Sequence, residues 1–297
     1  KRGGGEVELS QSLSGRLNMR LFWLVALTMA AFAANSVINR MALDTGVAEP
    51  AAFAAIRLAA GAVTLAVLLA IRGTTAVWAG GSAAGVASLL AYALGFSFAY
   101  VTLDAGAGAL LLFGGVQVTM FAAALAWGER ISLAKWAGTA MAFGGLCYLM
   151  WPAQGSGIGW GAPMMLIAAV GWGVYSLIGR GAQDALASTA GNFVLAAPFA
   201  LVVWALFPSW PAPSGVALAV LSGAVTSGLG YALWYRVLPQ LSVSTAAVAQ
   251  LTVPILAVIG GALLLGEELS VKLAVSAVLV LGGVALSLYR TKGSSAS

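Results

Sequence analysis

The sequence contains no histidine and only one cysteine, Cys147, among its 297 residues. Without histidine there is neither a Ser–His pair for nucleophilic catalysis nor a histidine-ligated metal. No two aspartates lie inside apolar segments, as an intramembrane aspartyl protease would need. A single cysteine also excludes an internal disulfide bond. We therefore expect no enzyme, no metal site and no cofactor.

Charged residues are scarce as well. They make up 8% of the chain, whereas soluble domains carry roughly 25%. Hydrophobic residues make up 61%, and the mean hydropathy is +0.97. The net charge of +5 does not indicate nucleic-acid binding, because the basic residues form no stripe and stand at the ends of apolar segments. This composition predicts a membrane protein surrounded by the lipid bilayer.

Ten apolar segments are long enough to cross a bilayer, whose hydrocarbon core of about 30 Å needs about 20 helical residues. They are residues 21–41, 50–71, 78–101, 105–127, 132–151, 159–179, 187–207, 214–237, 243–265 and 270–289. The predicted fold class is therefore an all-α membrane protein with ten transmembrane helices. Residues 1–18 and 291–297 are expected to be tails, the first of them disordered or non-native, and no removable signal peptide is expected.

One sequence pattern occurs twice, 140 residues apart. Phe32-Ala-Ala-Asn35-Ser36-Val-Ile38-Asn-Arg40 is echoed by Trp172-Gly-Val-Tyr175-Ser176-Leu-Ile178-Gly-Arg180. At an offset of 138 residues, Gly128-Glu129 and Gly144-Gly145 are echoed by Gly266-Glu267 and Gly282-Gly283. These echoes divide the chain into a first five-helix repeat at 19–151, a loop at 152–158 and a second repeat at 159–290. Because five is odd, the second repeat is inverted in the membrane, which is typical of transporters with a site near the bilayer midplane.

The distribution of lysine and arginine predicts the orientation. With ten crossings, the side that carries both termini holds eleven basic residues, and the other side holds only Arg40 and Lys272. The eleven are Lys1, Arg2, Arg16, Arg20, Arg72, Arg130, Lys135, Arg180, Arg236, Arg290 and Lys292. Positive residues accumulate on the cytoplasmic side, so both termini are expected in the cytoplasm.

Two copies of five helices, with a Gly-Glu pair ending the fourth helix of each copy and a Gly-Gly pair in the fifth, resemble the EamA-type branch of the drug/metabolite transporter superfamily. The resemblance covers residues 20–290. Aromatic residues on the inner helices make the chain most similar to the aromatic amino-acid exporters of that branch, the YddG type. The resemblance implies an inverted-repeat basket of ten helices, with a central cavity walled by helices one, three, four, six, eight and nine. It also implies export of metabolites from the cytoplasm across a bacterial inner membrane.

Aromatic side chains recur on one face of two expected helices. Tyr92, Phe96 and Tyr100 are spaced by four residues, and Tyr231, Trp234 and Tyr235 follow spacings of three and four. One interpretation places these stripes in the facing walls of a cavity. The other assigns Tyr100, Trp234 and Tyr235 to the aromatic belt at the membrane interface.

Polar side chains within apolar helices give a second indication, because lipid offers them no hydrogen-bond partner. They lie on helices one, four, six and nine, and are Asn35, Asn39, Gln117, Tyr175, Ser176, Gln250 and Thr252. Either they hold helices together, at about 0.6–2 kcal/mol each, or they share a polar cavity. Phe32 and Trp172, which match across the repeats, either stack on a substrate ring or pack against other helices.

Arg57 is the one charged side chain placed well inside an expected helix. A guanidinium there could bind a substrate carboxylate through two hydrogen bonds. The alternative, favoured from the sequence, is a structural ion pair with Asp44, Glu49 or Asp104 on the same face. Pro254 lies within the expected ninth helix and is either a hinge or a static kink.

All acidic residues of the expected bundle fall at helix ends, so the sequence shows no proton or sodium relay. We therefore expect facilitated export or exchange of neutral, preferentially aromatic, amino acids and related small metabolites by alternating access. Open alternatives are a channel, a proton-coupled drug or metabolite exporter, and a carrier of another solute class such as a nucleotide-sugar or phosphorylated metabolite. Beyond this substrate and the bilayer no partner is expected, and the oligomeric state stays open.

Overall fold

Helices account for all regular structure in the described part of the protein. The computed structural model describes residues 3–74, 76–128, 132–151, 159–237, 240–241 and 249–288, without the side chains of residues 3–18, Arg180, Tyr235 and Leu288. No strand occurs within these ranges. The predicted loop at 152–158, the C-terminal tail at 291–297 and the echo residue Glu129 lie outside them.

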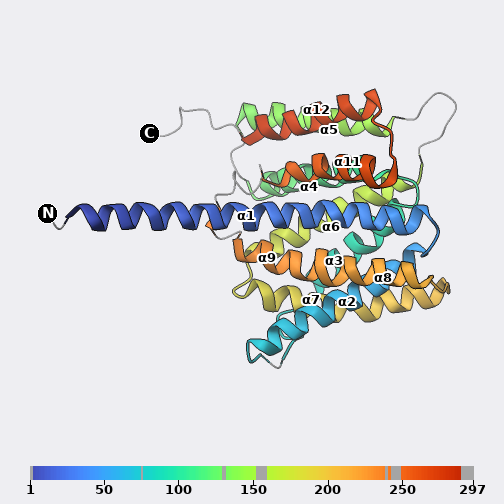
Figure 1. Ribbon diagram of the computed structural model, residues 1–297. Coiled ribbons are helices and arrows are strands. Elements are labelled where there is room, and N and C mark those ends of the chain that lie inside the picture. Colours follow the sequence, from blue (N-terminus) through green and yellow to red (C-terminus); the bar gives the residue numbers. More distant parts are fainter. Residues whose placement is uncertain are drawn as a thin grey trace.

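The helices follow one another along the chain (Figure 1). In order they are α1 (Gly3–Asp44), α2 (Pro50–Ile71), α3 (Ala83–Ala99), α4 (Ala105–Ala126), α5 (Leu133–Met150), α6 (Gly161–Arg180), α7 (Ala185–Leu206), α8 (Pro213–Leu221), η1 (Ser222–Leu229), α9 (Gly230–Val237), α11 (Thr252–Leu265) and α12 (Val271–Leu288). α1 extends from the span predicted at 21–41 back to Gly3, into the segment expected to be a tail. η1 is a π-helix that joins α8 to α9 without a break.

Six helical stretches in the described residues are long and apolar enough to cross a membrane. They are Met19–Asp44, Pro50–Ile71, Ala105–Ala126, Gly161–Gly179, Ala185–Leu206 and Pro213–Trp234, and three shorter apolar helices coincide with α3, α11 and α12. Large hydrophobic side chains such as Val63, Phe199 and Val278 are exposed. So much exposed apolar surface is unsuited to water and matches a lipid environment. The predicted class, an all-helical membrane protein, is confirmed at this level.

The third helix begins later than its apolar pattern predicts. The pattern starts at residue 78, but α3 starts at Ala83 because Ser82 caps it: the Ser82 Oγ accepts a hydrogen bond from the Gly85 N–H at 3.0 Å. Gly80 and Gly81 lie against the backbone of α7, so closely that a side chain at either position would collide with it. Residues 78–82 are thus an apolar connection packed on α7, which an apolar pattern alone does not distinguish from a helix.

Pro254 stands near the start of a helix and not in its middle. α11 begins at Thr252, so Pro254 lies in the first turn, where its missing N–H removes no helical hydrogen bond. The interruption is at Leu251, a turn residue between helical residues 249–250 and α11. The break predicted at Pro254 is therefore displaced to Leu251. A proline does lie inside a helix at Pro198, in α7.

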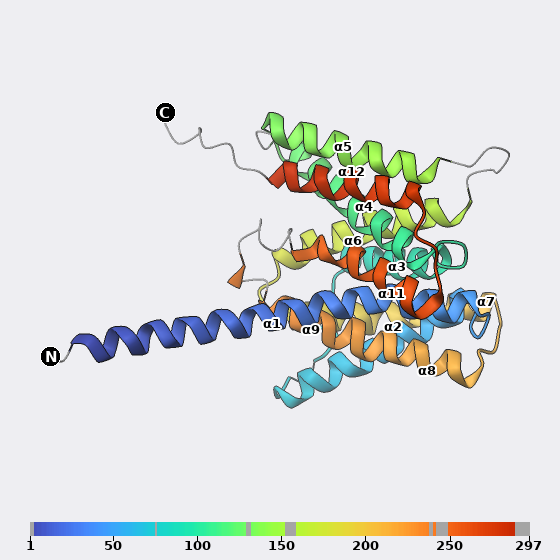
Figure 2. The same cartoon turned by 45° about the horizontal axis from the view of Figure 1, so that its top comes forward.

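Helices that are distant in sequence pack in pairs (Figures 1 and 2). α5 lies along α12, α4 along α11 and α2 along α7. α3 and α4 both pack on α6, while α8, η1, α9 and α11 pack on α1. α1 enters the bundle at the same end at which α12 finishes. The segments predicted as two repeats are therefore not separate bodies, because each packs mainly on the other.

Glycines allow the closest helix contacts. A side chain at Gly138 of α5 would collide with the carbonyl oxygen of Gly283 on α12. Small residues at such a crossing let two helices approach to backbone contact. Gly128 after α4 and Gly266 after α11 both adopt a left-handed φ, of 74° and 69°, a conformation that ends helices and favours glycine. The glycines of the Gly-Glu echo thus have the same structural role.

Candidate functional site

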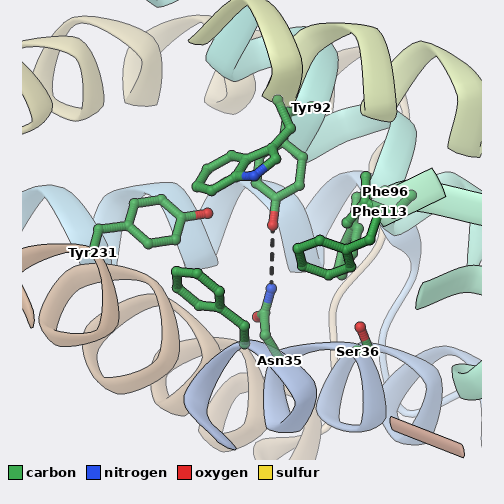
Figure 3. Close-up of a pocket in the computed structure, with 9 residues that line it drawn as sticks. Asn35, Ser36, Tyr92, Phe96, Phe113 and Tyr231 are labelled. Carbon is green, nitrogen blue, oxygen red and sulfur yellow. Dashed lines mark hydrogen bonds between the residues drawn. The ribbon is translucent and has the colours of Figure 1, made fainter. Parts of the chain in front are cut away.

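A closed cavity lies in the middle of the bundle, where α1, α3, α4, α6 and α9 meet (Figure 3). Its walls are formed by Phe32, Asn35 and Ser36 of α1, Tyr92 and Phe96 of α3, Leu112 and Phe113 of α4, Trp172 of α6 and Tyr231 of α9. The free volume is about 10 Å³, no more than one water molecule needs. A solute of amino-acid size therefore enters only if these side chains or helices move.

Aromatic rings make most of this wall. The Phe32 ring lies edge-to-face against the rings of Trp172 and Tyr231, with centroids 6.1 and 5.8 Å apart. Trp172 in turn contacts Tyr92 at 4.9 Å and Tyr231 at 4.8 Å. Each such ring pair contributes about 0.5–1.5 kcal/mol beyond the burial of its area. The rings of α1, α3, α6 and α9 therefore form one connected cluster, which holds the cavity closed.

A buried hydrogen-bond network lies beside the rings. The Asn35 Oδ1 accepts hydrogen bonds from the hydroxyls of Ser222 at 2.6 Å and Thr226 at 3.0 Å, and the Asn35 Nδ2 donates to the Tyr92 hydroxyl at 3.4 Å (Figure 3). Asn39, one turn further along α1, accepts a hydrogen bond from the Ser97 hydroxyl at 3.1 Å. The network thus ties α1 to α3 and to η1.

The π-helix supplies three hydroxyls to this network. Ser222 and Thr226 reach Asn35, and the Ser227 hydroxyl accepts a hydrogen bond from Arg57 Nε at 3.1 Å. Segments of π-helix are rare and occur mostly at functional sites. A side chain at Gly223 of η1 would collide with the Arg57 carbonyl oxygen, so η1 and α2 are in backbone contact here.

Arg57 is fully buried, at 1% exposure, and makes no ion pair with any described residue. Its Nη2 donates a hydrogen bond to the Tyr92 hydroxyl at 2.9 Å. The ion pair considered from the sequence is made by a different arginine, because Asp44 and Asp104 bind Arg40. Arg57 contacts Tyr92 and Phe96 of the cavity wall, and the other interpretation, binding of a substrate carboxylate, stays a prediction.

Several buried polar atoms at the cavity have no hydrogen-bond partner. They are Ser36 Oγ, Trp172 Nε1, the Tyr231 hydroxyl and Arg57 Nη1. Leaving a buried donor or acceptor unpaired costs about 1–3 kcal/mol, so a cluster of such groups requires an explanation. Binding of a polar solute at this cavity would satisfy them.

Six of the twelve residues predicted to line a cavity do so: Phe32, Asn35, Tyr92, Phe96, Trp172 and Tyr231. Three more are buried next to it: Asn39 in the network, Tyr175 stacked on Trp172, and Trp234 against Phe32. Gln117, Ser176 and Gln250 are half-buried and do not line it; the Ser176 hydroxyl donates to the Trp172 carbonyl of its own helix. Tyr100 and Trp234 are buried and are therefore not belt residues, whereas the Tyr235 side chain lies outside the described part.

The sequence analysis missed Ser36, Leu112 and Phe113 as cavity residues, and Ser222, Thr226 and Ser227 as network residues. Ser36 had a signal, because it belongs to the repeated pattern beside Asn35. Leu112 and Phe113 had no such signal, because an apolar residue in an apolar helix cannot be distinguished from its neighbours by sequence.

A cluster of charged groups lies at the end of the bundle near the α1–α2 connection. Arg40 of α1 lies 2.9 Å from Asp44, 3.5 Å from Asp104 and 3.8 Å from Glu267. The Glu267 carboxylate also accepts a hydrogen bond from the Ala105 N–H at the start of α4, at 2.6 Å. Burial raises the pKa of the Glu267 carboxyl above its ordinary value, and the Ala105 hydrogen bond and the Arg40 charge offset only part of this effect. The cluster joins α1, α4 and the α11–α12 connection.

Comparison with known proteins finds similarity to transporters, and to one transporter family over the second half of the chain. A model of the EamA-like transporter family matches residues 159–289. An uncharacterised protein of Pseudomonas aeruginosa is 46% identical over 93% of this chain and 97% of its own length. An uncharacterised transporter of Bacillus subtilis, YoaV, is 28% identical over 42% of this chain and 45% of its own length. A riboflavin transporter of Rhizobium johnstonii is 36% identical over 36% of this chain and 32% of its own length.

A solved protein structure supports the fold. It is 21% identical in sequence and aligns with a TM-score of 0.61 over 88% of this chain and 96% of its own. Together with the apolar helices, the family match shows a multi-pass membrane protein whose residues 159–289 form an EamA-like transporter domain.

Proposed function

We propose that this protein exports neutral, preferentially aromatic, amino acids and related small metabolites across a bacterial inner membrane. The observation that carries this proposal is the central cavity, which combines the rings of Phe32, Tyr92, Trp172 and Tyr231 with buried amide and hydroxyl groups. Rings stack on an aromatic solute, and a few polar groups fix its orientation.

Transport through this cavity requires alternating access by two inverted repeats of five helices. The helix pairing supports this symmetry. In the proposed symmetry, the helices α1, α2, α3, α4 and α5 correspond to α6, α7, α8–η1–α9, α11 and α12. The contact of α3 with α6 then corresponds to that of α8 with α1, and the contact of α4 with α6 corresponds to that of α11 with α1. The pairs α2–α7, α4–α11 and α5–α12 map onto themselves. A site at the interface of such repeats can open to either side by rocking of one repeat against the other.

In this proposal, the structure corresponds to a conformation in which solute cannot reach the cavity from the end of the bundle where α1 meets α2. The Arg40 cluster lies at that end. In the same proposal that end faces away from the cytoplasm and both termini lie in the cytoplasm, because lysine and arginine accumulate on the cytoplasmic side of membrane proteins. The start of α1 and the end of α12 at one end of the bundle agree with this orientation.

The drive for export is the substrate gradient. Described carboxylates lie at helix ends or in connections, where Asp44, Asp104 and Glu267 bind Arg40 and Asp184 lies 3.9 Å from Arg72. A proton-coupled carrier usually places a carboxylate or histidine inside the bundle. Glu267 is the residue through which a proton-coupled alternative would act, because its raised pKa brings its titration closer to neutral pH.

A second candidate substrate class is an uncharged ring system such as a flavin. The riboflavin transporter of Rhizobium johnstonii matches about a third of this chain, and an aromatic cavity stacks on a flavin as well as on an indole. Such a solute has no carboxylate, which separates it experimentally from an amino acid.

Counterflow in proteoliposomes tests the proposal. Vesicles containing the purified protein and loaded with unlabelled phenylalanine, tyrosine or tryptophan should accumulate the labelled amino acid transiently, and alanine or riboflavin loading should give less. A Trp172→Leu protein, reconstituted in equal amount, serves as the control for passage through the cavity. Equal accumulation in empty vesicles, or accumulation of riboflavin alone, contradicts the proposed substrate class.

A further inference from the structure

The positive charge of Arg57 is not neutralised by any described carboxylate. Asp44, Asp104 and Glu267 bind Arg40 at the end of the bundle, and no ion pair of Arg57 is formed. A buried ion without a counter-charge destabilises the folded protein, because it has lost its hydration and gained no opposite charge. The protein therefore keeps a destabilising charge in its interior, which indicates that the charge has a use there.

Neutral groups compensate this charge only in part. Arg57 Nε donates to the Ser227 hydroxyl and Nη2 to the Tyr92 hydroxyl, whereas the buried Nη1 has no partner. The guanidinium carbon also lies 5.1 Å from the Tyr92 ring centroid and 5.0 Å from that of Phe96. A desolvated cation is attracted to the face of an aromatic ring. These contacts hold the guanidinium in place without neutralising it.

The guanidinium lies directly behind the cavity wall. Tyr92 and Phe96, which it contacts, both line the cavity. The Tyr231 hydroxyl points into the cavity from the opposite repeat (Figure 3), is buried, has no hydrogen-bond partner and interacts electrostatically with Arg57. Two hydroxyls and one cation therefore converge at one side of a ring-lined space.

We propose that Arg57, with the Tyr92 and Tyr231 hydroxyls, binds the carboxylate group of the transported solute. This inference rests on the proposed function and narrows its substrate class to aromatic solutes that carry a carboxylate. When the cavity opens, the Tyr92 hydroxyl turns from Arg57 Nη2 and donates a hydrogen bond to one carboxylate oxygen. The guanidinium then binds the carboxylate through two parallel N–H···O hydrogen bonds. A lysine at this position would provide the positive charge but not the two parallel N–H donors of a guanidinium.

The site is single. At the 140-residue offset the second repeat has Ala197 where the first has Arg57, and Ala197 is buried and apolar. The proposed site therefore binds one carboxylate per transport cycle.

Competition measurements with phenylalanine and two relatives test this assignment. The relatives are 3-phenylpropionate, which keeps the carboxylate and lacks the amine, and 2-phenylethylamine, which keeps the amine and lacks the carboxylate. In wild-type vesicles 3-phenylpropionate should inhibit phenylalanine counterflow with an inhibition constant within about threefold of the phenylalanine KM, and 2-phenylethylamine at least tenfold more weakly. Arg57→Gln should lower phenylalanine affinity at least tenfold, and Arg57→Lys by less. Arg72→Gln, on an exposed arginine at the end of the same helix, should behave as wild type.

A binding measurement keeps the inference testable apart from transport. In detergent, 3-phenylpropionate should raise the melting temperature of the wild type and of Arg72→Gln but not that of Arg57→Gln. A folded Arg57→Gln protein that keeps wild-type affinity for phenylalanine, or a wild type stabilised equally by 2-phenylethylamine, overturns the assignment. Absence of aromatic amino-acid counterflow with retained carboxylate stabilisation contradicts the proposed function alone and supports the Arg57 site.

Discussion

The rings of Phe32 and Trp172 meet edge-to-face in the cavity wall, with centroids 6.1 Å apart and planes at 84°. The two residues open the two copies of the repeated sequence pattern, 140 residues apart. Equivalent positions of two inverted repeats meet only near the symmetry axis that relates them. If the two copies are inverted repeats, as proposed, the contact lies at the interface at which such transporters bind their solute.

Removing the Trp172 ring should weaken binding of aromatic solutes. Trp172 contacts Phe32, Tyr92, Tyr175 and Tyr231, and one ring pair contributes about 0.5–1.5 kcal/mol. Trp172→Leu should therefore raise the KM for phenylalanine about three- to tenfold, as measured by counterflow. Trp210→Leu, at a position 92% exposed, is the control, and an equal rise in both variants would assign the effect to general destabilisation.

Asn35 should be a stabilising residue as well as a cavity residue. Asn35→Leu leaves the Ser222 and Thr226 hydroxyls without their shared acceptor, and unpaired buried groups cost about 1–3 kcal/mol each. We expect a lower melting temperature in detergent, with partial recovery when Ser222→Ala and Thr226→Val are added. Gln117→Leu, on a half-buried position of α4, should change the melting temperature little. A stable Asn35→Leu protein would show that the network does not hold α1 to η1.

Two glycines of α5 should respond oppositely to alanine. At Gly138 a methyl group collides with the backbone of Gly283, whereas at Gly144 nothing lies within 4 Å. Overpacking of this kind costs about 1–3 kcal/mol, and replacing an open helical glycine gains about 0.5–1 kcal/mol. Thermal unfolding should therefore show a lower melting temperature for Gly138→Ala and an unchanged or higher one for Gly144→Ala. The reverse order would mean that α5 and α12 are not in backbone contact.

Breaking the Arg40–Glu267 contact should open the cavity towards that end. Glu267→Gln removes the charge that attracts Arg40 and keeps an oxygen that can accept from the Ala105 N–H. In a Cys147→Ser background, Ser36→Cys places the single thiol in the cavity wall. Its labelling by a membrane-impermeant reagent from the Arg40 side should be faster with Glu267→Gln and unchanged with Glu268→Gln, at the exposed neighbouring position.

The same carboxyl predicts a pH dependence of transport. The pKa of Glu267 is raised above 4.5 by burial, so acidification protonates it at a higher pH than an exposed glutamate and weakens its attraction to Arg40. Counterflow should accelerate as the pH falls through this raised pKa, and Glu267→Gln should be fast throughout. If Glu267→Gln keeps the pH profile of the wild type, another group controls the opening.

The sequence predicts the helices well where apolar length alone decides, and less well where the chain turns without becoming polar. α2 begins and ends where the apolar pattern does, whereas the start of α3 depends on the Ser82 cap and on glycines packed against α7. The cap is a local contact, but the glycine contacts join segments more than 100 residues apart, and no local pattern encodes them.

Within the site, spacing identified the residues of one helix but not their partners on another. Tyr92 and Phe96, four residues apart, both line the cavity, as an i, i+4 pattern predicts. The surroundings of Arg57 were not predictable, because its partner Ser227 is 170 residues away and reaches it from a π-helix. The preference for an ion pair followed from acidic residues predicted on the same face as Arg57, of which Asp44 and Asp104 bind Arg40 in the structure.

Photolabelling of the cavity tests the central claim, that an aromatic solute binds between the two repeats, most directly. A diazirine derivative of phenylalanine, activated by light on the reconstituted protein, should label peptides that contain Tyr92, Phe113, Trp172 or Tyr231, and excess phenylalanine should suppress the label. Labelling confined to exposed helix faces, or unaffected by excess phenylalanine, would contradict the account.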